Sequence, residues 1–353
     1  MSYMKRFRNW FRLAGRRLPR FPNSDQRLAC TVNLDTQAYN YEANWRRTTL
    51  ITDHKIEASS DAADYFQSSV ETIQRADIRF GTYISGGQVL ATARYYPAEA
   101  ITIEQTAWSQ SSIIHGVCVN RDGSVVHGSY VNLDEPVARL PFGRLLVEEI
   151  SSRPGDYVFL DNIAHNSAAG PHWFAWLNSC DLMRRVREGC PRCRKLLIVN
   201  IAVDPGALNI VELEQLAMSV DGVAFEMPFV RARRERFGNQ YDLIENYRYL
   251  LDAGKLIVLI PVDAALETEA QRDAERRFIA AFAMMIRKPG DRLFVAWPFW
   301  KPAPDWATWP QDFGAAFSPA TVNPEQQFIE RRFRNGRLQL DLTGVVLWVK
   351  VSE

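Results

Sequence analysis

Short apolar runs recur along this chain, and helical patterns or long loops separate them. Such runs indicate strands buried on both faces, and their alternation with helices is typical of a parallel sheet. Eight strands in about 270 residues is the number that a (β/α)8 barrel requires. An open doubly wound sheet is the alternative, but it usually has a Gly-rich first turn, which is missing here. The expected strands are 28–35, 48–53, 78–85, 155–162, 195–202, 220–226, 255–263 and 292–297.

The fold class expected is therefore α/β, a (β/α)8 TIM barrel with two additions. Residues 86–136 interrupt the rhythm after the third strand, and the turn 120–123 with the alternating segment 124–131 predicts a hairpin there. We expect this insertion to form a wall of the active cleft, because a loop of this length is usually functional. A turn at 334–337 and strands at 338–342 and 345–349 predict a small C-terminal β element. The expected helices are 61–75, 136–152, 170–189, 210–218, 241–251 and 266–287.

Three parts of the chain are expected: a basic N-terminal tail at 1–27, the barrel at 28–332 and the β element at 333–353. The tail carries basic and apolar residues together, so it is either a disordered tail or a segment that lies on an anionic membrane surface. Neither a signal-peptide core nor a transmembrane run is found in the sequence, which predicts a cytoplasmic protein.

The composition argues against a nucleic-acid-binding protein, a disulfide-bonded protein and a zinc protein. Of 353 residues, 47% are apolar and 24% charged, and the formal net charge of +1 argues against nucleic acid as a partner. Five cysteines are an odd number and favour a reduced compartment over a disulfide framework. Cys180, Cys190 and Cys193 resemble half a zinc site, but no second ligand pair follows, so we expect a turn and no metal.

Two of the expected strands end in a carboxylate. The run 157–160 ends at Asp161 and the run 222–225 ends at Glu226. In a barrel these acids would end strands four and six, at the edge where catalytic residues collect. Neighbouring strands lie about 4.8 Å apart, so the two backbones would be roughly 10 Å apart and the carboxyl groups closer. That spacing suits a glycosidase acid pair, either retaining or inverting.

Other side chains near strand ends are candidates for binding a substrate. Amides and hydroxyls can bond sugar hydroxyls, and aromatic rings at a barrel rim can stack on sugar C–H groups. Several have a structural alternative: Asp263 could cap a helix, Asn200 could satisfy backbone groups, and the tryptophans could close the barrel. The candidates are Asp35, Tyr83, Asn162, His165, Asn200, Asp263, Trp297 and Trp300.

The segment 156–162 resembles the Asp-Gly-hydrophobic-Phe-Leu-Asp-Asn strand of a group of TIM-barrel glycoside hydrolases, the hypothetical glycosyl-hydrolase-like families near the endo-α-1,4-polygalactosaminidases and dextranases. The segments 80–86, 222–226 and 333–336 support the resemblance, and Tyr157 departs from it where these families have Gly. The resemblance implies a cofactor-free hydrolase of α-linked oligo- or polysaccharides. It implies Asp161 as nucleophile and Glu226 as proton donor.

Two other functions remain open from the sequence. A barrel could bind glycan without cleaving it, in polysaccharide export or sensing, and would keep its aromatic rim. A metal-dependent hydrolase would use Asp161, His165 and Asp263, although the strand-end His-x-His spacing of such enzymes is absent.

Overall fold

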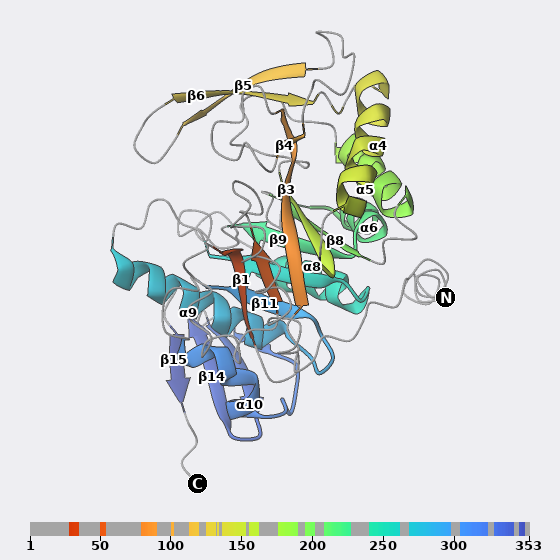
Figure 1. Cartoon of the computed structure of the whole chain (residues 1–353). Coiled ribbons are helices and arrows are strands. Elements are labelled where there is room, and N and C mark those ends of the chain that lie inside the picture. The colour runs from red at the N-terminus through yellow and green to blue at the C-terminus, as the bar shows by residue number, and fades with distance from the viewer. Residues whose placement is uncertain are drawn as a thin grey trace, which may run out of the picture.

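The structure is a computed structural model (Figure 1). Our description is confined to residues 28–34, 50–53, 79–89, 100–101, 113–119, 125–131, 133, 136–152, 155–161, 176–189, 195–201, 208–226, 240–261, 268–297, 304–323, 328–341 and 346–349. The basic segment 1–27 and the expected helix at 61–75 lie outside these ranges. None of the described helices is both long and apolar enough to cross a membrane.

Eight parallel strands close into a barrel, as the sequence predicts. Each strand pairs in parallel with the next, and β1 pairs with both β2 and β11, which completes the ring. The strands in ring order are β1 (Ala29–Leu34), β2 (Leu50–Asp53), β3 (Arg79–Val89), β7 (Tyr157–Asp161), β8 (Leu196–Ile201), β9 (Gly222–Glu226), β10 (Leu256–Ile260) and β11 (Leu293–Ala296).

The register of the strands fixes the stagger of the barrel. When paired residues are followed once around the ring, through the Thr31–Ile51 pair between β1 and β2, the path returns to β7 eight residues from its start. This shear of eight is the value that (β/α)8 barrels have. Residues at one height along the barrel axis therefore shift by one position from each strand to the next.

Side chains alternate between two separate cores. One apolar cluster lies inside the barrel, and a larger one lies between the strands and the surrounding helices. On β7, Tyr157 and Phe159 belong to the inner cluster, whereas Val158 and Leu160 belong to the outer cluster. This alternation is the period of two that strand geometry requires. The inner cluster comprises Cys30, Tyr157, Phe159, Leu196, Ile198, Ala224, Leu256, Val258, Ile260, Phe294 and Ala296.

Tyr157 determines which residue can stand beside it on β3. Tyr157 is fully buried inside the barrel and pairs with Gly81 of β3. A Cβ atom at Gly81 would lie 2.1 Å from Cε2 of the Tyr157 ring. The ring therefore fills the space that a side chain at Gly81 would need, which accounts for the glycine at this position.

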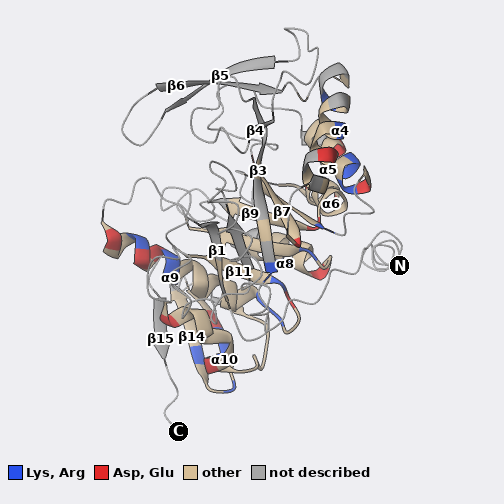
Figure 2. Ribbon diagram, viewed as in Figure 1, with Lys and Arg blue, Asp and Glu red and all other residues tan. Residues whose placement is uncertain are grey.

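Helices pack around the outside of the barrel (Figure 1). Along the sequence each of α4, α5, α6, α8 and α9 contacts the next. The helix at 170–189 is described only from Trp176, and the four other expected helices that lie within the described ranges agree with the sequence to within three residues. Figure 2 shows opposite charges on the exposed first half of α9, where Glu269 and Asp273 pair with Arg272 and Arg276. The bounds are α4 (Pro136–Ser152), α5 (Trp176–Gly189), α6 (Ile210–Ser219), α8 (Gln240–Asp252), α9 (Glu269–Ile286), η7 (Asp305–Thr308) and α10 (Trp309–Phe313).

The insertion after the third strand contains the predicted hairpin. Strands β5 (Ile113–Val119) and β6 (Val125–Val131) pair antiparallel over their whole lengths. Strand β3 extends beyond the barrel to Val89, where it pairs with the short β4 (Ala100–Ile101) and, through Gln88, with β6. Figure 1 shows the hairpin beyond the carboxyl end of β3.

The C-terminal β element is a four-stranded antiparallel sheet that packs against α9. It comprises β12 (Thr321–Asn323), β13 (Phe328–Phe333), β14 (Gly336–Asp341) and β15 (Val346–Val349). The sheet thus has strands on both sides of residue 333, the boundary that we expected. The predicted turn joins β13 to β14, so β13 is a strand that the sequence did not indicate. Its inward positions include a charged residue, Arg331, which interrupts the apolar alternation.

Candidate functional site

Asp161 and Glu226 lie at the carboxyl ends of β7 and β9, with β8 between them. Leu160 of β7 pairs with Val199 of β8, so the next residues, Asp161 and Asn200, are level in the hydrogen-bond register. Asn200 pairs with Ala224 of β9, which makes Ala224 the residue level with Asp161 on that strand. Two strand steps around a barrel of shear eight raise that level by two residues, to Glu226. Asp161 and Glu226 therefore occupy the same layer of the barrel.

Alternation identifies the face on which these positions lie. Asp161 follows Tyr157 and Phe159 in the inward alternation of β7. On β9, a Cβ at Gly222 would lie 3.0 Å from Leu256 Cβ, which is an inner-core atom, and Ala224 belongs to the inner cluster. Glu226 is the next position of that alternation. Both acids thus occupy the next inward positions after the inner core, at the carboxyl edge of the barrel, where TIM barrels place their active sites.

Asn200 is a polar residue that the structure connects directly to Asp161. Its Nδ2 atom donates a hydrogen bond of 3.0 Å to Oδ1 of Asp161. The Asn200 side chain is 5% exposed and follows Leu196 and Ile198 on the inward face of β8. The sequence offered Asn200 as a ligand for sugar hydroxyls or for backbone groups, and the structure shows its amide bonded to the Asp161 carboxylate.

The remaining predicted binding residues fall into three groups. Tyr83 lies in β3 opposite Phe159, and the stagger of the barrel puts its position in the same layer as Asn200. Trp297 is 4% exposed and packs in the outer cluster, because Phe294 and Ala296 take the inward positions of that segment. This packing agrees with the alternative that the tryptophan closes the barrel, and a role in binding stays a prediction. Residues outside the described ranges are Asp35, Asn162, His165, Asp263 and Trp300.

Within the described ranges, no group of three or more His, Cys, Asp or Glu side chains is arranged to hold a metal ion. Cys180 is a buried free thiol on α5, and burial raises its pKa to about 12. A thiol in this state is a small apolar core residue and a poor nucleophile. Cys190 and Cys193 lie outside the described residues.

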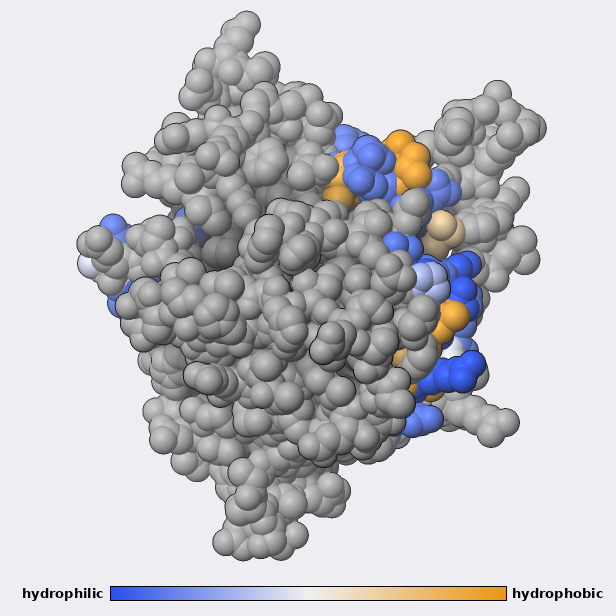
Figure 3. All heavy atoms as spheres, turned by 90° about the horizontal axis from the view of Figure 1, so that it is seen from above, coloured by the Kyte–Doolittle hydropathy of each residue, from blue (hydrophilic) through white to orange (hydrophobic). Residues whose placement is uncertain are grey.

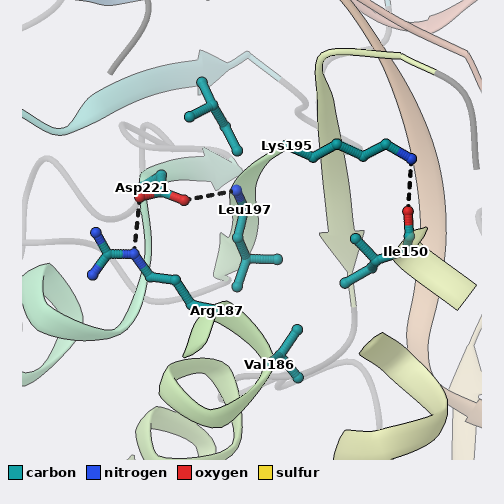
Figure 4. Close-up of a pocket in the computed structure, with 7 residues that line it drawn as sticks. Ile150, Val186, Arg187, Lys195, Leu197 and Asp221 are labelled. Atoms are coloured by element: carbon teal, nitrogen blue, oxygen red, sulfur yellow. Dashed lines mark hydrogen bonds and ion pairs between the residues drawn. The ribbon is translucent and has the colours of Figure 1, made fainter. Parts of the chain in front are cut away.

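A small pocket lies at the opposite, amino-terminal end of the strands (Figure 4). Its buried carboxylate, Asp221, accepts hydrogen bonds from the Leu197 backbone N–H at 3.1 Å and from Arg187 Nε at 2.9 Å. Lys195 Nζ donates to the Ile150 carbonyl at 2.7 Å. These groups are paired with each other or with the backbone, and this end of a TIM barrel serves stability. We therefore do not assign a reaction to this pocket.

Figure 3 shows the molecule from above the view of Figure 1, with hydrophilic and hydrophobic residues mixed where described residues reach that surface. The described residues there do not form one continuous apolar patch, which is the usual mark of a docking surface.

No family model matches this chain, and no curated protein sequence matches it. Its fold is similar to solved glycosidase structures at very low sequence identity. The Aspergillus fumigatus Ega3 complex with galactosamine is 12% identical with a TM-score of 0.43, covering 76% of this chain and 87% of that one. An α-amylase from Malbranchea cinnamomea is 10% identical with a TM-score of 0.47, covering 91% and 86%. At these values the likeness carries no argument about function, and the barrel assignment rests on the strand pairing.

Proposed function

We propose that this protein is a glycoside hydrolase that cleaves an α-linked oligo- or polysaccharide with two carboxylates. Asp161 acts as nucleophile or base, and Glu226 acts as general acid/base. The observation that carries the proposal is the placement of both acids in one layer at the carboxyl end of a closed barrel. The α linkage rests on the resemblance of residues 156–162 and 222–226 to α-glycosidase barrels.

The chemistry needs one carboxyl group that is protonated and one that is ionised. The proton donor assists departure of the leaving oxygen, and the ionised group attacks the anomeric carbon or activates a water. Two strand steps of about 4.8 Å put the two backbones roughly 10 Å apart, so side chains that reach toward each other can flank a glycosidic bond. No cofactor enters this mechanism.

The test is turnover by the full chain on a panel of α-linked glycans that includes α-1,4-linked polygalactosamine and dextran. Asp161→Asn and Glu226→Gln should each lower the rate of bond cleavage by about 100-fold or more. Glu245→Gln, which alters an exposed carboxylate on α8, serves as the matched control and should retain wild-type activity. Circular dichroism should show that all three variants are folded.

Full activity in either Asp161→Asn or Glu226→Gln would overturn the assignment of the residues. A wild-type protein that binds one of these glycans without cleaving any of them, and whose affinity survives Glu226→Gln, would instead support a non-catalytic glycan-binding barrel. Loss of turnover on chelation, restored by a divalent cation, would indicate metal-dependent hydrolysis. Where turnover is found, proton NMR of the first product anomer separates retention from inversion.

A further inference from the structure

We propose that Asn200 is a positioning residue of this site, whose amide holds the Asp161 carboxylate ionised and in one orientation. The inference rests on the proposed function for its catalytic meaning, since it concerns how the acid on β7 is prepared for its role. It assigns to Asn200 a task different from contact with a substrate.

The location of Asn200 is unusual for an amide. On β8 the two preceding inward positions, Leu196 and Ile198, are apolar members of the inner core. Asn200 comes next and is 95% buried, with an exposed fraction of 5%. A buried amide without partners is costly, so a polar residue here requires a reason. The hydrogen bond to Asp161 supplies that reason.

The amide has one orientation that suits its neighbour. An ionised carboxylate can only accept hydrogen bonds, so the NH2 group must face Asp161 and the amide oxygen must face away. The Asn200 Oδ1 atom is buried and has no hydrogen-bond partner within the described part of the chain. Among those residues the Asp161 carboxylate is thus the group that fixes the amide.

The hydrogen bond from Asn200 distinguishes the protonation states of the two acids. A hydrogen bond donated to a carboxylate favours its charged form over its protonated form. The 3.0 Å bond also restricts rotation of the Asp161 carboxyl group about its last side-chain torsion. Asp161 is therefore prepared as the ionised nucleophile or base, and the proton that the reaction needs falls to Glu226.

The experiment follows the ionisation of Asp161 directly, without requiring turnover. The chain is labelled with aspartate carrying carbon-13 in the side-chain carboxyl group, and Asp161→Asn assigns the Asp161 signal. In Asn200→Ala the midpoint of the Asp161 titration should move to higher pH by about 1 pH unit, because a donor to the charged form is lost. In Asn200→Asp, which keeps the shape, it should move further, because two carboxylates then share the site.

Kinetics provide the second readout where a glycan is cleaved. The acid limb of the pH profile of kcat/KM should move by the same amount as the NMR titration in each variant, and kcat should fall about tenfold or more with KM nearly unchanged. Asn246→Ala is the matched control, because Asn246 on α8 also donates through its amide, to the Leu208 carbonyl at 3.1 Å. It should leave both the titration and the profile unchanged.

The two proposals fail in different ways. An Asp161 titration that is unaltered in folded Asn200→Ala and Asn200→Asp proteins overturns the role of Asn200, whatever the activity. If the Asp161 titration shifts in both Asn200 variants but the wild-type protein cleaves no glycan, the positioning role of Asn200 is supported. The same result overturns the proposal that the protein is a hydrolase. If Asn200→Ala does not fold, the isosteric Asn200→Asp variant decides the question alone.

Discussion

Replacement of Arg331 by methionine should destabilise the protein by about 2–6 kcal/mol. Arg331 lies on β13 of the C-terminal sheet with 5% of its surface exposed. Its guanidinium group donates to the carbonyls of Met284, Met285 and Arg287 at the end of α9, and to the Ser318 carbonyl at 3.0 Å. The side chain thus satisfies carbonyls that the end of a helix leaves without partners, and it ties the sheet to the barrel.

The magnitude is a difference between two opposing terms. The three N–H groups that face these carbonyls each contribute about 1.5–3 kcal/mol, the range for hydrogen bonds to charged groups. Against this, burial and the nearby Arg248 lower the pKa of Arg331 from its ordinary value to about 10. That shift is equivalent to about 3 kcal/mol of unfavourable charge burial, which the uncharged methionine recovers. The remainder is a net loss of about 2–6 kcal/mol.

The measurement is the free energy of unfolding from urea titrations followed by circular dichroism, with equal slopes in both proteins. The matched control is Arg332→Met on the same strand. The Arg332 side chain is 71% exposed and its Nε lies 3.4 Å from Oε1 of Glu330, so the loss of this surface pair should cost less than about 1 kcal/mol. Arg331→Lys should be intermediate, because one ammonium cannot reach all four carbonyls. A loss at Arg331→Met no larger than that at Arg332→Met would refute the reasoning.

Two further predictions concern the barrel itself. Gly81→Ala should destabilise the fold by about 2 kcal/mol or more, because the new Cβ would lie 2.1 Å from the Tyr157 ring. Adding Tyr157→Leu to the same chain should relieve part of that cost. Strictly additive losses of unfolding free energy in urea titrations would contradict the packing argument. Burial, with Arg187 nearby, lowers the pKa of Lys255 from 10.5 to about 8. The unfolded chain therefore binds more protons between pH 8 and 10.5, and the stability of the wild type relative to Lys255→Met should rise over that interval, by at most about 3 kcal/mol. A difference that is independent of pH would show that the amine is not desolvated.

The strands of the barrel could be recognised in the sequence because they are buried on both faces. Such strands have to be apolar at nearly every position, and this makes the runs that end at Asp161 and Glu226 visible without a structure. Helix ends also depend on the local sequence. Gly254 after α8 adopts φ 75°, which glycine accepts and other residues avoid, so a glycine marks this helix end in the sequence. In β13 the inward charge of Arg331 interrupts the apolar alternation, so the sequence did not predict this strand.

The relations between strands required the tertiary structure. Whether Trp297 faces a ligand or the helices depends on which alternate residues of its strand point inward, and Phe294 and Ala296 settle that only once the barrel has closed. The hydrogen bond between Asn200 and Asp161 joins neighbouring strands that are distant in sequence.

The sequence by itself determined which residues end the strands, because hydrophobic burial is a local requirement on each strand. The closure of the ring and its shear of eight residues decided that Asp161 and Glu226 share one layer, because relative height in a barrel depends on the register of every strand pair around it.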